Sequence, residues 1–428
     1  MADPSPPLGP DRRWVLTASG AAASAIAGLA GCSDASVAAA PDGNVVTVAT
    51  TPGQGPGAGP SSLGSAPDRL RSDAAVLATS VTARVGVPYD RPLWVSVHGG
   101  RAGDHLESVT LRRSGELVSG AFDSSRQTWT ARQLVPGSSY VLAAVLSGAG
   151  APWRRSFTTA PPTRTLRTSI VPSDEATVGV GMPVVVSFNH PVHRRAAVER
   201  ALRVETTSPV TGAWRWSSDR SVTFRPATYW PGNTRVRVGV ALAGVDAGGG
   251  VWGVANPAPV HFSTGDAVIS RVDLTAHQLT VAVNGAVVRT IPVTGGRPGM
   301  TTRSGISVIS QKYADIRMDS ETVGYRKGST NYYDLPVHWA MRITSSGEFL
   351  HAAPWSVAAQ GRQNVSHGCV GMSPADARWL YQHSSIGDVV EVVGSRRALE
   401  PGNGWTDWNV SWREWRSGPD AAVEVVRT

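Results

Sequence analysis

The amino-acid sequence predicts a mainly β protein made of several domains. Gly occurs 46 times and Pro 30 times, a content that favours turn-rich β modules over helical bundles. From residue 73 onward, short runs place apolar residues at every second position and are separated by Gly, Pro or Ser, as in strands with one buried face. The 428 residues allow roughly two to four domains, and a hydrophobic content of 41% is enough to fill their cores.

The charge of the chain is positive but scattered. Lys and Arg number 40, and Asp and Glu number 32, which gives a net charge of +8. No long block of basic residues occurs, so we expect no nucleic acid partner. A mildly basic surface beside an anionic envelope polymer or membrane fits this balance, and so does ordinary solubility.

Residues 1–32 are predicted to be an export signal. Arg12 and Arg13 precede an uncharged run from Trp14 to Gly31 that is mostly Ala, Gly and Ser. This pattern resembles a twin-arginine signal, and the run is too mildly apolar for a membrane-spanning helix. It ends in "LAGC", which resembles the bacterial lipobox, where the chain is cleaved before a cysteine whose sulfur is then acylated.

Two hypotheses follow for Cys32. Either it carries acyl chains that hold the exported protein on the cell membrane, facing the cell wall or periplasm, or the signal is unlipidated and is cut elsewhere. No later segment reaches about 18 apolar residues, so the sequence predicts no other membrane anchor. We favour a lipoprotein, and Cys369 then has no partner for an intramolecular disulfide.

Residues 33–72 are predicted to be a disordered linker, because a segment so rich in Ala, Gly, Pro, Ser and Thr cannot bury enough apolar surface to fold. Residues 73–162 and 163–265 each contain a series of strand-like runs, such as "PLWVSVHGG" and "TRVRVGVAL". Two consecutive modules of this kind predict tandem immunoglobulin-like sandwiches. The second is interrupted by one helical turn at "HRRAAVERAL", and the histidines of both modules are too scattered for a catalytic site.

Residues 266–395 are predicted to form a third, β-rich domain with one main helix. Asn284 and Gly285 stand between alternating apolar runs, which is a strong signal for a type I′ hairpin. Ser373, followed by Pro374 and by apolar residues at helical spacing, predicts the N-terminus of the helix. We expect "GDVVEVVG" to close the domain as a strand.

Residues 396–428 form a Trp-rich tail. Trp405, Trp408, Trp412 and Trp415 are spaced by 3, 4 and 3 residues, which would place four indoles on one face of a helix. Such a face could be a platform on which sugars stack, or it could pack back onto one of the domains. We favour packing.

The stretch "NVSHGCVGMS", residues 364–373, is where we expect chemistry. A thiol becomes a nucleophile when its thiolate is favoured and a base stands within hydrogen-bond reach. Gly368 permits a tight backbone conformation, and the backbone N–H groups of Gly368 and Cys369 could converge on an oxyanion. The helix near Ser373 would bring its positive dipole end close to the sulfur.

The base is either His351, 18 residues before the cysteine, or His367. His351 ends an alternating run and is expected near the surface, whereas His367 is too close in sequence to point the same way as Cys369. We therefore favour His351 as the base and His367 as a site-shaping or substrate-facing residue. Two alternatives remain for Cys369: a buried apolar filler, or a zinc ligand together with both histidines, a site that would lack a clear fourth ligand.

The stretch "HAAPWSVAAQGRQNVSHGCVGMSPADA", residues 351–377, is similar to the active-site signature of L,D-transpeptidases, the YkuD-like family. In that family a histidine precedes a Ser/Thr-His-Gly-Cys element by a short loop. Two immunoglobulin-like modules, an L,D-transpeptidase catalytic domain and a Trp-rich tail together resemble the mycobacterial type of these enzymes. The resemblance covers roughly residues 73–418.

The resemblance implies an acyltransferase of peptidoglycan biosynthesis. Cys369 attacks the carbonyl between meso-diaminopimelate and D-Ala of a tetrapeptide stem, D-Ala leaves, and a diaminopimelate amine of a second stem accepts the acyl group to form a 3-3 cross-link. His351 matches the base, which the family orients through the backbone carbonyl of the next residue, here Ala352. The oxyanion hole and the shape of the site are assigned to Ser366, His367, Gly368 and the N–H of Cys369.

The resemblance also implies a substrate cavity, with lining residues at Tyr333, Met318, Trp355 and Gly371. Residues 311–333 resemble a hairpin lid that gates this cavity. Gly371 departs from the family, which usually carries Asn there, and so lacks a side chain that could hydrogen-bond the loop or the substrate. Carbapenem β-lactams are expected to acylate the thiol, and we expect no cofactor, no metal and a monomeric state.

Two further functions remain open. An L,D-carboxypeptidase would use water in place of the amine acceptor, and the sequence does not separate these two reactions. A cell-wall-binding scaffold with a weakened site is the non-enzymatic alternative, suggested by Gly371 and the tandem modules.

Overall fold

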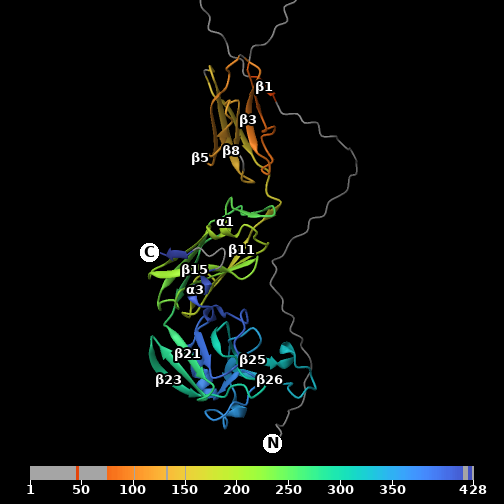
Figure 1. The fold of residues 1–428 in the computed structure, drawn as a ribbon. Helices are drawn as coiled ribbons and strands as arrows, with labels where there is room; N and C mark the ends of the chain where they lie inside the picture. Colours follow the sequence, from red (N-terminus) through yellow and green to blue (C-terminus); the bar gives the residue numbers. More distant parts are fainter. Residues whose placement is uncertain are drawn as a thin grey trace, which may run out of the picture. The chain divides into compact units, whose positions relative to one another are not determined.

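A computed structural model of the chain describes residues 45–47, 75–100, 102–131, 134–149, 151–417 and 423–426 (Figure 1). The predicted signal at 1–32, with Cys32, and most of the linker at 33–72 lie outside these residues. Strands far outnumber helices in the described part, which confirms the mainly β prediction. No helix among the described residues is both long and apolar enough to cross a bilayer.

The first module pairs two antiparallel sheets around one core. The first sheet has the order β1 (Val45–Thr47), β2 (Val76–Thr79), β3 (Leu93–His98), β7 (Thr128–Ala131), β6 (Ala121–Phe122). The second has the order β5 (Glu116–Val118), β4 (Leu106–Arg113), β8 (Ser139–Leu146), β9 (Trp153–Thr158). Alternate residues of these strands, including Leu93 and Leu111, are buried between the sheets, as the period-2 patterns predict.

The second module also has two main sheets, with a small third one and helix α1 (Arg195–Glu199) at the predicted helical turn. One sheet has the order β11 (Thr168–Val171), β13 (Val184–Phe188), β16 (Ser221–Pro226), β15 (Val210–Trp216), β30 (Val423–Val426). The other has the order β12 (Ala176–Val178), β20 (Val260–Thr264), β17 (Arg235–Val240), β14 (Leu202–Thr206). The small sheet is β10 (Arg164–Thr165), β19 (Val251–Trp252), β18 (Asp246–Gly248).

The third module contains a five-stranded and a four-stranded sheet. The first has the order β23 (Ala286–Pro292), β22 (Gln278–Val283), β21 (Val268–Asp273), β29 (Val389–Val393), β24 (Gly305–Val308). The second has the order β25 (Gln311–Asp319), β26 (Asp334–Arg342), β27 (Phe349–Ala352), β28 (Val370–Met372). Helix α2 (Pro374–His383) contacts β26 and β27, and the short 3-10 helices η1 (Ser320–Val323) and η2 (Pro354–Ser356) lie in the connections.

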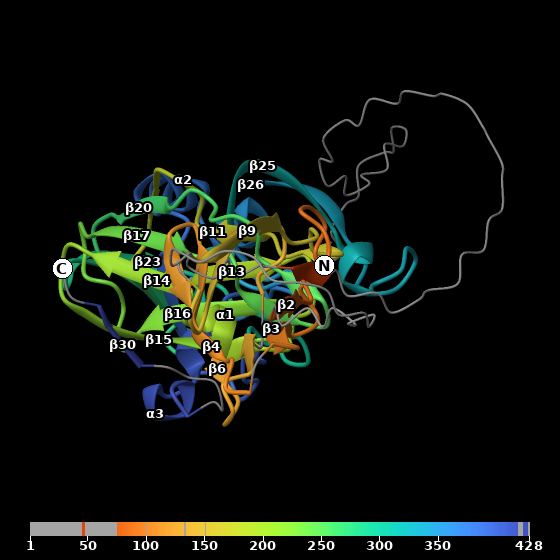
Figure 2. The ribbon, with the colours of Figure 1, turned by 90° about the horizontal axis from the view of Figure 1, so that it is seen from above.

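The local signals in this module gave the predicted structures. Asn284 and Gly285 both have positive φ, 51° and 84°, and connect β22 to β23, which confirms the hairpin. The Ser373 side chain accepts a hydrogen bond from the Asp376 N–H at 3.1 Å and caps α2, with Pro374 at the first position of the helix. β25 and β26, of nine residues each, form eight antiparallel pairs and run side by side as one long hairpin (Figure 2).

The Trp-rich tail does not form the single helix that the spacing predicted. It contains a 3-10 turn, η3 (Asp407–Asn409), and one helical turn, α3 (Trp412–Trp415), separated by Val410 in an extended conformation. The physical reason is Arg225 of β16, which is 2% exposed and donates a hydrogen bond to the Val410 carbonyl at 2.6 Å. The expected helical face of four indoles was therefore wrong.

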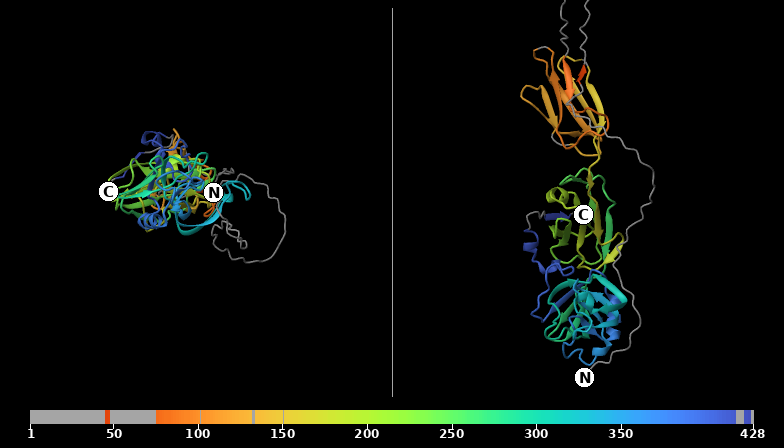
Figure 3. Two further views of the ribbon diagram at one scale, coloured as in Figure 1. Left: turned by 90° about the horizontal axis from the view of Figure 1, so that it is seen from below. Right: turned by 90° about the vertical axis from the view of Figure 1, so that its right-hand side faces the viewer.

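The tail packs onto the second module, as favoured from the sequence. The Arg225 guanidinium lies 4.9, 5.6 and 4.7 Å from the ring centres of Trp408, Trp412 and Trp415. Trp405 packs against the core of the same module, and β30 adds a strand beside β15. Figure 3 shows the dark blue C-terminal segment beside the green second module. These contacts hold the C-terminal segment against the second sandwich.

Candidate active site

The predicted nucleophile and base come together through a parallel strand pair. In β27 and β28, His351 lies opposite Gly371, and Cys369 directly precedes β28. Side chains two residues apart on a strand share a face, so Cys369 and His351 project from the same face of the sheet. The sulfur also receives a hydrogen bond from the N–H of Phe349, which lies two residues before His351 in β27.

Cys369 is buried beneath the β25–β26 hairpin, with 8% of its surface exposed. It packs in an apolar cluster with Met318, Val337 and Phe349. Its thiol donates a hydrogen bond to the Gly347 carbonyl over 3.6 Å. Burial raises the pKa of the thiol to about 12, although a hydrogen bond from the Phe349 N–H acts in the opposite direction. The resting cysteine is therefore a neutral thiol.

The predicted helix dipole does not act at this sulfur. All of β28 lies between Cys369 and the capping residue Ser373. Three strand residues span roughly 10 Å, which exceeds the distance over which a helix terminus exerts its field. Activation of the thiol must come from a neighbouring base.

His351 is buried, with 5% of its surface exposed, so the expectation that it lies near the surface was wrong. All four residues of β27 are buried, because the strand lies inside the module and is covered on both faces. The Nδ1–H donates to the Ala352 carbonyl at 2.8 Å, which leaves the lone pair on Nε2. Burial lowers the pKa of His351, so the ring is neutral at pH 7 and can accept a proton.

The loop from Ser366 to Cys369 is held by the side chains of Ser366 and Thr302. Ser366 Oγ donates to the Cys369 carbonyl at 2.6 Å and accepts from the Gly368 N–H at 3.1 Å. The Gly368 N–H, predicted as an oxyanion donor, is therefore already engaged within the loop. Gly368 has φ of +132° and its carbonyl accepts from Thr302 Oγ1 at 2.7 Å, a conformation that favours glycine.

His367 points toward a residue that the sequence analysis did not single out. Arg297 Nη2 lies 3.0 Å from His367 Nε2 and donates to Asn331 Oδ1 of the lid at 2.9 Å. The ring of Tyr333 lies 5.2 Å from the His367 ring. Arg297 follows the Gly-Gly pair after β23, a turn-like stretch in which nothing marked it as part of the site.

The remaining predicted residues lie in or next to the β25–β26 hairpin, in η2 and in β28. Met318 is buried against Cys369, and Tyr333 packs on the same cluster, where burial raises its pKa to about 12. Trp355 is 54% exposed, with its ring 6.0 Å from His351. A Cβ added to Gly371 would lie 2.8 Å from Ala353 Cβ, so the space that a side chain would need is already filled.

The arrangement is suited to acyl transfer by a thiol. It provides a buried thiol, a neutral imidazole with a free Nε2 on the same sheet face, and an exposed indole at the edge. Among the described residues, no three His, Cys, Asp or Glu side chains gather in a way that could hold a metal ion.

Comparisons with known proteins point in the same direction. Residues 267–392 match the YkuD family, described as the L,D-transpeptidase catalytic domain, and residues 84–246 match Big_10, described as a bacterial Ig domain. L,D-transpeptidase 2 of Mycobacterium tuberculosis is 38% identical over 374 residues, which is 85% of this chain and 90% of that relative. L,D-transpeptidase 1 of the same organism is 41% identical over 226 residues, 53% of this chain and 84% of the relative.

A solved structure of an L,D-transpeptidase in complex with imipenem is also similar. It is 40% identical, covers 54% of this chain and all of its own, and superposes with a TM-score of 0.47.

Proposed function

The chain belongs to the L,D-transpeptidase family, and from this premise we propose that it cross-links peptidoglycan stems through a thioester on Cys369. The observation that carries the proposal is the register of β27 and β28, which puts Cys369 and His351 on one face. The hydrogen bond from His351 Nδ1 to Ala352 directs the basic Nε2 away from the backbone. Tetrapeptide stems with meso-diaminopimelate at the third position are the proposed acyl donors.

In the first half-reaction, Cys369 attacks the carbonyl between diaminopimelate and D-Ala while His351 Nε2 takes the thiol proton. Because both groups are neutral at rest, no charge is buried before the substrate arrives. The tetrahedral intermediate collapses, the C–N bond breaks, and His351 returns the proton to the departing amine of D-Ala. A thioester remains on Cys369.

In the second half-reaction, a diaminopimelate amine of a neighbouring stem attacks the thioester. His351 takes the proton of this amine and returns it to the cysteine sulfur as the C–S bond breaks. The products are a 3-3 cross-link and a free thiol. The β25–β26 hairpin, which packs on Cys369 through Met318, would have to open to admit each stem.

The test uses the protein without residues 1–32, incubated with a disaccharide tetrapeptide and followed by mass spectrometry. A cross-linked dimer with release of D-Ala supports transpeptidation, whereas tripeptide alone supports an L,D-carboxypeptidase in which water is the acceptor. If no product forms, the remaining function is that of a wall-binding scaffold. Cys369→Ala should remove all turnover, and turnover that persists would exclude Cys369 as the nucleophile.

The same thiol should open a carbapenem ring, because the strained β-lactam carbonyl is an acyl donor like the stem peptide. One equivalent of carbapenem should add to Cys369 in intact-mass spectra, and none should add to Cys369→Ala. An adduct on Cys369→Ala would overturn this proposal.

We also propose that Cys32 carries the lipid that holds the enzyme on the outer face of the cell membrane. The sequence "LAGC" and the long Ala/Gly/Pro linker that follows it support this proposal. Mass spectrometry of the membrane fraction should find acyl mass on Cys32. Release of the protein into the soluble fraction with an unmodified Cys32 would contradict it.

A further inference from the structure

A short turn directly beneath the cysteine sulfur supplies its two backbone partners. This turn, residues 344–348, is here called the thiol turn. Its Gly347 carbonyl accepts the Cys369 S–H, and the residue that follows it, Phe349, presents its N–H to the sulfur. Any displacement of the thiol turn therefore moves both groups that orient the thiol.

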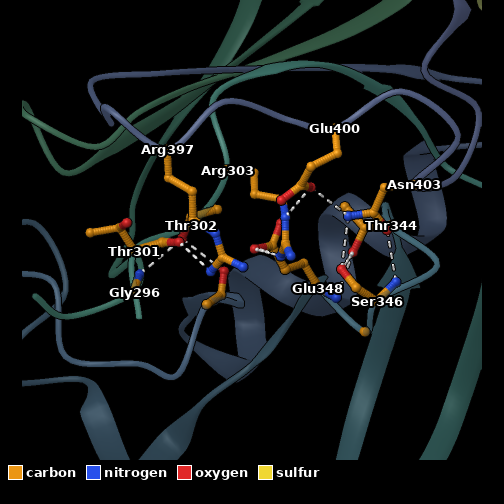
Figure 4. A network of polar contacts seen from close by, with 12 residues as sticks. Gly296, Thr301, Thr302, Arg303, Thr344, Ser346, Glu348, Arg397, Glu400 and Asn403 are labelled. Carbon is orange, nitrogen blue, oxygen red and sulfur yellow. Dashed lines mark hydrogen bonds and ion pairs between the residues drawn. The ribbon is translucent and has the colours of Figure 1, made fainter. Parts of the chain in front are cut away.

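The thiol turn is bound by a segment from beyond the catalytic domain (Figure 4). Asn403 Oδ1 accepts from the Ser346 N–H at 2.9 Å, and Asn403 Nδ2 donates to Ser346 Oγ at 2.9 Å. The same Nδ2 donates to Glu400 Oε2 at 3.0 Å, which fixes the orientation of the amide. One side chain of the tail thus forms two hydrogen bonds with the thiol turn.

Two ion pairs that share Arg303 join the same tail segment to the buried side of the loop from Ser366 to Cys369. Arg303, with 12% of its side chain exposed, donates to Glu348 at 2.9 Å and to Glu400 at 2.5 Å. Glu348 is 6% exposed at the side chain, and its Oε1 would lie 3.4 Å from a Cβ placed on Gly368. Burial raises the pKa of Glu348 and the Arg303 charge opposes that shift.

A third contact of the tail reaches Thr301, the neighbour of Thr302, which holds the loop from Ser366 to Cys369. Arg397 donates to the Thr301 carbonyl at 3.2 Å, next to Thr302, whose hydroxyl holds the Gly368 carbonyl. Figure 4 shows Arg397 beside Thr301, Glu400 beside Arg303 and Asn403 beside Ser346, so one short stretch of chain contacts both residues 301–303 and the thiol turn. We call these three residues the C-terminal brace.

We propose that the C-terminal brace positions Cys369 for acylation, with Asn403 and Glu400 as positioning residues that hold the thiol turn in place. This inference rests on the proposed role of Cys369 as the nucleophile. Exposed ion pairs by themselves stabilise a protein little, and Glu400 is 53% exposed at the side chain. The contribution of the brace is therefore geometric, since an error of about 1 Å in a reacting atom costs on the order of a hundredfold in rate.

The experiment measures carbapenem acylation of the protein without residues 1–32, separating the maximal acylation rate from the half-saturating concentration. Asn403→Ala should lower the maximal rate about tenfold while the half-saturating concentration changes less than twofold, because none of the proposed substrate-lining residues changes. Asn403→Asp keeps an acceptor for the Ser346 N–H but loses the donor to Glu400 and places a second carboxylate beside it, so the maximal rate should fall in this variant as well. Mass spectrometry gives the fraction of protein that can be acylated, and the rate is expressed per acylatable site, so unfolded protein does not affect it.

The matched control is Asn409→Ala in the same tail. Asn409 bonds both backbone groups of Ile306 in β24, at 2.7 and 2.6 Å, and is not bonded to the thiol turn in the described part of the chain. The Asn409→Ala variant should lower the melting temperature as Asn403→Ala does, yet leave the acylation rate per site unchanged. Equal rates for Asn403→Ala and the wild type, or an equal fall in Asn409→Ala, would overturn the positioning role. A wild type that no carbapenem acylates would instead refute the proposed nucleophile.

Discussion

Arg297 Nη2 donates to Nε2 of His367 across 3.0 Å. A guanidinium has donors only, so the histidine nitrogen must be the acceptor and its lone pair is occupied. Burial lowers the pKa of His367, and the adjacent positive charge of Arg297 lowers it further. His367 is thus held neutral with no basic nitrogen free on that side, whereas Nε2 of His351 is not used by the Ala352 contact.

The two histidines should therefore respond differently to substitution. His351→Gln removes the base and should lower the carbapenem acylation rate by about 10²–10⁴-fold. His367→Gln retains an acceptor for Arg297 and should cost about tenfold or less. Stopped-flow acylation of both variants decides the assignment, and an equal loss in the two variants would contradict it.

The pH dependence of acylation should show one ionisation on the acid side. Burial lowers the pKa of His351, so the ring stays neutral down to a pH below the ordinary value of about 6.5, and the rate falls only as it protonates below that. Because the pKa of Cys369 is raised to about 12, the rate should be level from pH 7 to 9. A rate that climbs through pH 8–9, as for an ordinary thiol, would argue against proton removal by His351.

Gly371 should tolerate no side chain unless Ala353 shrinks. A Cβ at residue 371 would lie 2.8 Å from Ala353 Cβ and 3.2 Å from Thr294 Cγ2. Gly371→Ala is expected to lower the free energy of unfolding by about 1–3 kcal/mol through overpacking. Adding Ala353→Gly should recover most of that loss in a double-mutant cycle measured by chemical denaturation. Simple additivity of the two changes would show that the strain lies elsewhere.

Arg225 should not be replaceable by lysine. Burial lowers its pKa to about 10, so it remains charged at pH 7, and it donates to the carbonyls of Pro226 and Val410 from two nitrogens. Lysine cannot reproduce this fork or stack on the indoles, so Arg225→Lys should cost about 2 kcal/mol of stability. Thermal denaturation measures the loss. Arg413 is exposed, so Arg413→Lys serves as control, and an equal loss there would contradict the role of the Arg225 contacts.

Local sequence signals predicted the parts of the catalytic domain that depend on short stretches of chain. Asn284-Gly285 specified its hairpin and Ser373-Pro374 specified the start of α2, because turn and cap geometry depends on a few adjacent residues. The single helix predicted from the Trp spacing in the tail was wrong, because a hydrogen bond from Arg225 to Val410 competes with helix formation. Helical periodicity cannot register a partner 185 residues away in sequence.

Residue types and their spacing were enough to identify the chemistry: a cysteine in a Ser-His-Gly-Cys element, a histidine 18 residues before it, and strand-rich modules between a linker and a tail. Three features became visible only in the folded chain: Arg297 occupies Nε2 of His367, the Gly368 N–H is engaged, and Asn403 holds the turn beneath the sulfur. Residue types and their spacing fix which groups are present. Burial and hydrogen-bond partners, which depend on segments far apart in the chain, fix the protonation state and direction of each group.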